Sequence, residues 1–268
     1  MRVPGTHAGT VVTAPNRFPE RDTNDAAVTV AACERVQTNW FRRRAEEIGG
    51  EVWADGPLNW IDGPDGLNLM FPRELPAAAL HRGINRAREL GRPTVGAWLG
   101  LDVDSTPLVQ AGFERGWSPW WMTAPLAAVA GPADPRVELQ HDSTDYRGEH
   151  AAYRDQLALT RLEPAFAWYA AAYTHHPLQA TDKSVRFAGR AWSFLDTDNL
   201  AGIFDMAVWE PFRRRGLGTA LLRIVCAAAA EAGAHHACLN ATAEGKLLYS
   251  TCGFTQIGEG ITWWLRLR

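Results

Sequence analysis

Hydrophobic positions along this chain follow two patterns, one with helical spacing and one typical of buried strands. In the first half, apolar residues at helical spacing predict a helix from Ala26 to Ile48, which ends at Gly49-Gly50. A second helix is predicted from Pro76 to Leu90, and a buried strand follows from Thr94 to Leu101. A helix followed directly by a strand is typical of an α/β arrangement.

The second half continues this alternation of helices and strands. A strand is predicted over Val137–Gln140, and the region Thr144–Tyr173 is interpreted as helical, with a break or kink at Pro164. Two runs rich in Phe, Trp, Val and Ile, Val185–Leu195 and Leu200–Val208, predict two strands joined by a short turn. The remaining expected elements are a helix through Leu221 and Leu222 that ends at Gly233, a strand over Ala237–Asn240, a helix over Glu244–Ser250 and a last strand over Ile261–Leu267.

The length of the chain, 268 residues, predicts two domains. The stretch Ala128–Arg136 contains two prolines and a glycine and is interpreted as the linker between them. Residues 1–25 show no apolar periodicity and are interpreted as a loosely ordered leader. We therefore expect one domain over residues 26–130 and another over residues 137–268, both of the α/β (α+β) class.

Composition and charge exclude several classes of protein. The formal net charge of −3 and 21% charged residues do not favour a nucleic-acid binder or a membrane-surface binder. The sequence has no apolar run long enough for a membrane helix and no signal-peptide layout near its start, so a cytoplasmic location is expected. The four cysteines lack metal-ligand spacing and are interpreted as reduced packing residues, and no metal is expected.

The segment that carries candidate chemistry runs from Arg213 to Thr219. It follows a predicted strand, contains Gly216 and Gly218, and opens a predicted helix. Such a loop directs unpaired backbone N–H groups and the positive end of a helix dipole to one point, which favours phosphate binding. A tight turn with a solvated basic run is the alternative interpretation. The segment has neither the Lys-Ser/Thr ending of a Walker loop nor the third glycine of a Rossmann fingerprint.

The pattern Arg213-x-x-Gly216-x-Gly218 after a strand resembles the acyl-CoA-binding motif of the GNAT superfamily of N-acetyltransferases. A second signature agrees with the first, since Tyr249 lies on a predicted helix four residues before the pair Gly253-Phe254. The resemblance covers residues 137–268. One departure concerns the region before residue 192, where the spacing leaves little room for the strands that the family usually has there.

The first half resembles a decayed second copy of the same fold. The predicted strand Thr94–Gly100 leads through Leu108 to another Gly-Phe pair at Gly112-Phe113. Leu108 stands where the second half has Tyr249, and no Arg-x-x-Gly-x-Gly pattern precedes it. The resemblance thus implies a tandem protein with two GNAT-like domains, each with a mixed, mostly antiparallel sheet flanked by helices, of which the first has lost its CoA site.

The resemblance also implies roles for individual residues. Backbone N–H groups of the loop would hold the CoA pyrophosphate, the strand before it would bind the pantetheine arm and the thioester carbonyl, and Tyr249 would protonate the leaving thiolate. Asn240, at the end of the next strand, would contact the pantetheine or a water. The expected acyl-CoA-binding residues are Met206, Ala207, Val208, Arg213, Arg214, Arg215, Gly216, Leu217, Gly218, Thr219, Asn240 and Tyr249.

The general base is less constrained by the sequence. Asp205 and Glu210 flank the expected acyl site, and His175 and His176 end a predicted helix nearby. Asp205 is taken as the candidate base, in addition to Tyr249 as the candidate acid. Alternation along the strand places the Asp205 side chain on the same face as Ala207. For each of these four side chains a structural or surface role is the alternative, because surface charges and lone histidines are common.

The resemblance implies an enzyme that transfers an acetyl group from acetyl-CoA, or another acyl-CoA, to an amine of a small molecule, with no metal. The first domain would shape or cover the substrate cleft. Two alternatives remain open: an acceptor that is a protein amino terminus or lysine, and a non-catalytic protein that binds acyl-CoA or a partner.

Overall fold

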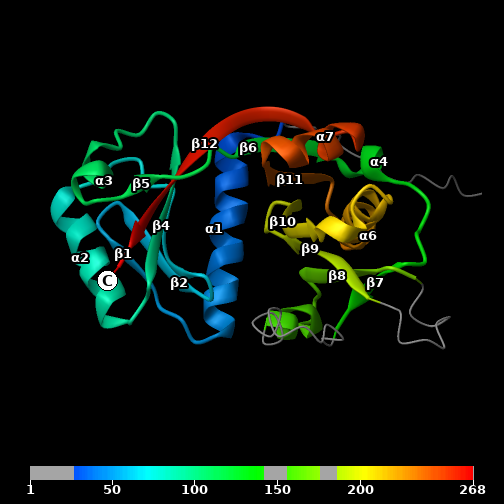
Figure 1. Ribbon diagram of the computed structural model, residues 1–268, viewed down its shortest axis with the longest axis horizontal. Coiled ribbons are helices and arrows are strands. Elements are labelled where there is room, and N and C mark those ends of the chain that lie inside the picture. The colour runs from blue at the N-terminus through cyan, green and yellow to red at the C-terminus, as the bar shows by residue number, and fades with distance from the viewer. Residues whose placement is uncertain (1–26, 142–155, 176–185, 268) are drawn as a thin grey trace, which may run out of the picture.

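The computed structural model describes residues 27–141, 156–175 and 186–267 (Figure 1). The expected leader, residues 1–25, lies outside the described residues, as do His176 and the first part of the helix expected over residues 144–173. The helices are α1 Val30–Glu47, α2 Ala77–Glu89, α3 Thr106–Gln110, α4 Leu126–Val129, α6 Leu217–Glu231 and α7 Ala243–Thr251, with 3-10 turns η2 Leu157–Arg161 and η3 Glu210–Phe212.

The strands of the described residues form one mixed sheet of 12 strands. They are β1 Val52–Asp55, β2 Leu58–Gly63, β3 Gly66–Met70, β4 Thr94–Gly100, β5 Glu114–Arg115, β6 Trp120–Pro125, β7 Val137–Gln140, β8 Ala167–Tyr173, β9 Phe187–Leu195, β10 Leu200–Val208, β11 His236–Ala241 and β12 Thr255–Arg266. Their order is β1-β2-β3-β4-β12-β6-β11-β10-β9-β8-β7, with β5 paired to β12. The α/β class is confirmed, but a single continuous sheet replaces the two separate sheets expected from the sequence.

The same order of elements occurs twice along the chain. An antiparallel meander β1-β2-β3 is followed by α2 and by β4, which pairs in parallel with β3. Likewise, the meander β8-β9-β10 is followed by α6 and by β11, which pairs in parallel with β10. Each parallel strand is then followed by a short helix, α3 or α7.

The two series are joined because they exchange strands. β6 follows the first series in sequence but pairs with β11 and with residues 255–259 of β12. The rest of β12, Gly260–Arg266, pairs with β4 of the first series. In Figure 1 β12 crosses from the C-terminal half to the N-terminal half. The continuity of the sheet therefore depends on strands that lie more than a hundred residues apart in sequence.

Helix α1 lies between the two halves (Figure 1). Its Thr29 N-cap accepts a hydrogen bond from the Ala32 N–H, as is usual for a helix start. On the side of the C-terminal half, Trp40 is fully buried and stacks on Phe204 of β10 with ring centroids 5.3 Å apart. Val36 of α1 packs against β10 as well, because a Cβ added at Gly202 would lie 2.7 Å from Val36 Cγ1. The sheet face of β10 is thus covered by a helix from the N-terminal half.

One expected element is wrong. Residues 167–173 belong to the strand β8 and not to a helix. All but one of its residues are buried, so the strand shows no polar alternation, and its alanines resemble those of a helix. This strand also explains the spacing before residue 192, since it supplies the strand that the sequence interpretation lacked.

Two further findings concern the described residues as a whole. None of their helices combines the length and the apolar character that a membrane span requires. Their four cysteines are all buried and free of disulfides, which agrees with the interpretation of packing residues.

Candidate functional site

The segment Arg213–Thr219 joins β10 to α6 through two residues with left-handed backbone. Arg214 has φ +62° and Gly216, the N-cap of α6, has φ +80°. No side chain of the described residues caps this helix start, and the first intrahelical bond among these residues runs from the Ala220 N–H to the Gly216 carbonyl. The preceding N–H groups therefore point outward from the helix start, which is the arrangement that binds phosphate oxygens.

The two glycines of the loop differ in what their positions require of the side chain. Gly216 requires the positive φ, and an added Cβ would have open space, since the closest group is Arg136 Nη2 at 4.0 Å. Gly218 is closely packed, because an added Cβ would lie 3.0 Å from Leu248 Cδ2 of α7 and 3.6 Å from Met206 Cε of β10. Gly216 thus shapes the open start of α6, which we call the cradle, and Gly218 lets α6, α7 and β10 approach one another.

The three arginines of the loop are exposed, and Arg213 is fixed in place. Its Nε donates to the Val208 carbonyl at 2.9 Å, and its Nη1 pairs with Glu244 at 2.9 Å, so it ties the end of β10 to the start of α7. A further arginine, Arg136, was missed in the sequence. Its Nη2 donates to the Arg215 carbonyl at 3.1 Å, and its guanidinium pairs with Asp134 at 2.6 Å, so it ties the loop to the segment before β7.

The strand β10 separates from β11 before it reaches the loop. Parallel pairing joins Leu200–Ile203 to His236–Leu239, whereas the pairing of β10 with β9 continues to Val208. On its other side, β11 pairs with β6 over its whole length, His236–Ala241. Among the described strands, the edge of β10 from Asp205 to Val208 therefore has no partner on the β11 side, and it can accept an extended ligand as an added strand.

A bulge in β10 sets the direction of Asp205. Ile203 and Met206 pack on the face that α6 covers, and Phe204 packs on the face that α1 covers. Regular alternation would place Asp205 with Ile203, yet its carboxylate lies 3.7 Å from Nη1 of Arg44 on α1. The pairing register shifts after Phe204, and Asp205 has φ +47°, so the bulge turns its side chain to the α1 face.

Tyr249, a residue of α7, belongs to the core on the opposite face of the sheet, which α6 covers. It is 8% exposed, and its ring centroid lies 5.9 Å from that of Phe254. Burial, with a smaller effect of Cys252, raises the pKa of Tyr249 to about 12. The hydroxyl therefore keeps its proton at neutral pH and can act as a proton donor.

Asn240 lies where β11 has separated from β10, and its side chain points to α1. Its Nδ2 donates to Gln37 Oε1, and Gln37 is 2% exposed. Asn240 Oδ1 and Gln37 Nε2 are both buried, and neither has a hydrogen-bond partner among the described residues. The first half of the chain thus contributes a side chain next to the predicted site, which the sequence did not indicate.

The remaining candidate bases lie elsewhere. Glu210 begins the exposed turn η3, beyond the end of β10. His175 is exposed and follows β8, which β9 separates from β10 in the sheet. Of the candidates that the structure describes, only Asp205 is brought to the bulge.

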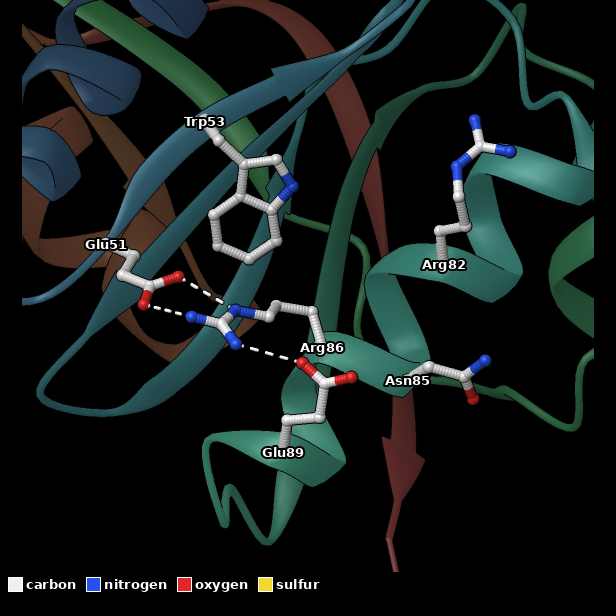
Figure 2. Close-up of a pocket in the computed structure, with 6 residues that line it drawn as sticks. All are labelled: Glu51, Trp53, Arg82, Asn85, Arg86 and Glu89. Carbon is white, nitrogen blue, oxygen red and sulfur yellow. Dashed lines mark hydrogen bonds and ion pairs between the residues drawn. The ribbon is translucent and has the colours of Figure 1, made fainter.

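A cavity of about 470 Å³ lies in the N-terminal half, between the start of β1 and α2 (Figure 2). Figure 2 shows Arg86 held between Glu51 and Glu89 by paired hydrogen bonds. Arg82, in the same lining, pairs with Asp55 at 2.7 Å. Its charged groups thus neutralise one another, and the cavity lies at the other end of the molecule from the loop at the start of α6 (Figure 1). We do not assign it a role.

Comparisons with known proteins support the fold and a family match in the C-terminal half. The profile of the acetyltransferase (GNAT) domain family matches residues 175–256, which include the loop, the split strands and Tyr249. No curated protein matches the chain in sequence.

Solved structures resemble the chain over most of its length. A GCN5-related N-acetyltransferase from Kribbella flavida has 15% identity and a TM-score of 0.56, with 88% of this chain and 96% of that chain covered. A functionally unknown conserved protein from Staphylococcus epidermidis has 14% identity and a TM-score of 0.52, with 82% and 96% covered. A GCN5-related N-acetyltransferase from Sphaerobacter thermophilus has 16% identity and a TM-score of 0.50, with 79% and 76% covered.

At these identities the solved structures establish the fold alone. The family profile, in contrast, matches the loop Arg213–Thr219 and the adjoining strands. The match over residues 175–256 therefore identifies a GNAT domain within the C-terminal half of this chain.

Proposed function

We propose that this protein is an N-acetyltransferase that uses acetyl-CoA and acts on the amine of a small molecule. The observation that carries the proposal is the split between β10 and β11, which ends at the uncapped start of α6. The residues fit acetyl-CoA, because the open cradle at Gly216 suits a pyrophosphate and the free edge of Asp205–Val208 suits the pantetheine arm.

When bound, acetyl-CoA supplies the acetyl group as a thioester. Backbone N–H groups of Leu217, Gly218 and Thr219 would hold the pyrophosphate, with positive charge from Arg214 and Arg215 nearby. Along β10, the backbone of Met206, Ala207 and Val208 would align the arm, and one N–H there would polarise the thioester carbonyl. Asn240 would contact the arm from β11.

The acid and the base would act from opposite faces of the sheet. Asp205 is turned to the α1 face, where it would accept a proton from the attacking amine. Tyr249 lies on the α6 and α7 face, where it would donate a proton to the leaving thiolate. A thioester held in the split between β10 and β11 would lie between the two groups.

The first half supports a small acceptor. Helix α1 covers β10 up to the bulge, and Arg44 and Gln37 of this helix reach Asp205 and Asn240. An acceptor that approaches the α1 face must therefore pass beside the N-terminal half, which leaves less room for a folded protein than an open groove would. We further propose that the two halves, residues 26–130 and 137–268, are tandem GNAT-like units and that the first no longer binds CoA.

The first test measures the thermal midpoint with and without excess acetyl-CoA. A ligand present at about a hundred times its Kd stabilises the folded state by roughly 2.7 kcal/mol. We expect a clear upward shift for the wild type and a much smaller one for Arg214→Glu/Arg215→Glu. The matched control Arg42→Glu/Arg88→Glu carries the same charge change on exposed positions of α1 and α2 and should keep the full shift.

A second measurement separates catalysis from binding. CoA release is followed with a panel of small amines and with lysine-containing peptides. Turnover with a small amine supports the proposal, whereas turnover with peptides alone favours a protein acceptor. A thermal shift without turnover of any amine would favour a non-catalytic acyl-CoA-binding protein.

A further inference from the structure

The guanidinium of Arg44 contacts a different partner with each of its three nitrogens. Nη2 lies 2.8 Å from Asp65 Oδ2, Nη1 lies 3.7 Å from Asp205 Oδ2, and Nε donates to Gln156 Oε1 at 3.2 Å. The Arg44 side chain is 4% exposed, and its Cζ lies 5.8 Å from the centroid of the Trp40 ring. Its position is therefore fixed on every side by described residues of both halves.

The backbone of Asp205 is strained in the direction of this contact. A non-glycine residue in the left-handed region is disfavoured, and such strain persists only where the surroundings maintain it. In Asp205 this conformation turns the carboxylate from the α6 face to the α1 face, where Arg44 is the charged group within ion-pair distance. The ion pair with Arg44 offsets part of the cost of that conformation.

We infer that Arg44, on the N-terminal half, is a positioning residue that holds Asp205 in the orientation required of the general base. The inference rests on the proposed function, in which Asp205 accepts the proton of the amine. A buried arginine that lost its carboxylates would be costly, so Arg44 also has a structural role. Asp65 shares this structural role, but it lies on the β2–β3 turn and its side chain is 63% exposed.

This difference between the two carboxylates provides the control. If Arg44 acts only as a structural tie, then Arg44→Lys and Asp65→Asn should change stability and leave turnover unchanged, whereas Asp205→Asn lowers turnover in either case because it removes the base itself. If Arg44 positions the base, then only its contact with Asp205 affects turnover. A double-mutant cycle between Arg44 and Asp205 measures this coupling directly.

The experiment uses the full chain with acetyl-CoA and an amine that the wild type acetylates. We expect Arg44→Lys, which keeps the charge but loses the planar fork, to lower kcat about 10- to 100-fold, as is typical of small misplacements of a reacting group. The KM for acetyl-CoA should stay within about twofold. In an Asp205→Asn background, Arg44→Lys should cause no further loss, and Asp65→Asn alone should keep turnover within about twofold.

Three results would contradict the inference. The first is a kcat of Arg44→Lys equal to that of the wild type. The second is a loss of kcat from Arg44→Lys that is as large in the Asp205→Asn background as in the wild type. The third is a loss of kcat in Asp65→Asn as large as that in Arg44→Lys. Thermal midpoints identify variants that fail to fold, and Arg44→Lys retains the buried charge so that the cycle can be completed. A wild type that binds acetyl-CoA and acetylates no amine would contradict the proposed function as well, whereas the three results above leave that function intact.

Discussion

Leu108 and Tyr249 occupy the same backbone position in the two halves of the chain. The Leu108 carbonyl accepts the N–H of Phe113 at 3.0 Å, and the Tyr249 carbonyl accepts the N–H of Phe254 at 3.0 Å. The glycine before each phenylalanine has nearly the same φ, +89° in the first half and +88° in the second. Both side chains are buried, but only the second carries a hydroxyl, so only the second half has a proton donor at this position.

Replacement of this hydroxyl should separate chemistry from binding. We expect Tyr249→Phe to lower kcat about a hundredfold, within the range for the loss of a general acid, while the KM for acetyl-CoA changes little. Leu108→Met, a change of similar volume at the equivalent position, serves as the control and should leave kcat unchanged. Steady-state kinetics of CoA release provides the measurement, and an unchanged kcat in Tyr249→Phe would exclude this residue as the acid.

The same tyrosine should make stability depend on pH in alkaline solution. Burial raises the pKa of Tyr249 to about 12, against about 10 when it is exposed in the unfolded chain. Below pH 10 both states keep the proton, and the contribution is constant. Between pH 10 and 12 the unfolded state releases the proton while the folded state keeps it, so the free energy of unfolding falls, by on the order of 2 to 3 kcal/mol.

Urea denaturation of the wild type and of Tyr249→Phe between pH 8 and 12 measures this contribution. The difference in unfolding free energy between the two proteins should be constant up to pH 10 and should then change in favour of the variant. Parallel curves up to pH 12 would contradict the buried, protonated state of Tyr249.

The uncapped helix start at Arg213–Thr219 could be predicted from the sequence because its geometry is local. A strand, the run Arg213–Thr219 and a helix follow one another within a few residues, and each glycine is visible in the sequence. The close packing at Gly218, in contrast, depends on Leu248 of a later helix, which no local pattern indicates. Local order thus predicts a cradle, and long-range packing determines what each residue does in it.

The features that sequence analysis missed all depend on contacts between distant residues. The exchange of β6 and β12 requires pairing between segments more than a hundred residues apart. The face of Asp205 depends on a bulge, and no periodic pattern predicts a bulge from hydrophobicity. Its partner Arg44 lies on a helix of the other half, and no pattern in the sequence links it to Asp205.

The cradle glycine can be tested against a glycine with the same backbone requirement elsewhere. Gly216 has φ +80° and Gly233, at the other end of α6, has φ +103°. In neither case would an added Cβ have a heavy atom closer than 4.0 Å. Alanine at either position should therefore cost about 1 kcal/mol of unfolding free energy through backbone strain alone.

Binding should distinguish these two variants. We expect Gly216→Ala to weaken acetyl-CoA binding, because strain at φ +80° disturbs the loop that presents the N–H groups, and Gly233→Ala to bind normally. Calorimetric titration with acetyl-CoA measures both affinities. Equal affinities at equal loss of stability would show that the conformation at Gly216 does not matter for the ligand.

The exchanged strands also predict how the chain unfolds. Because β12 pairs with β4 in one half and with β6 in the other, neither half can lose its sheet without disturbing the other. Trp40 links the halves through the core as well, since its ring contacts those of Trp192 and Phe204. We expect a single unfolding transition, and Trp40→Ala should lower the unfolding free energy of the whole chain by about 3 to 5 kcal/mol.

Far-ultraviolet circular dichroism and tryptophan fluorescence should give coincident urea curves for the wild type and for Trp40→Ala. The control Arg42→Ala, on the exposed side of α1, should leave the urea midpoint unchanged. Two separate transitions, or a shift of one half alone in Trp40→Ala, would mean that the halves unfold independently despite their shared sheet.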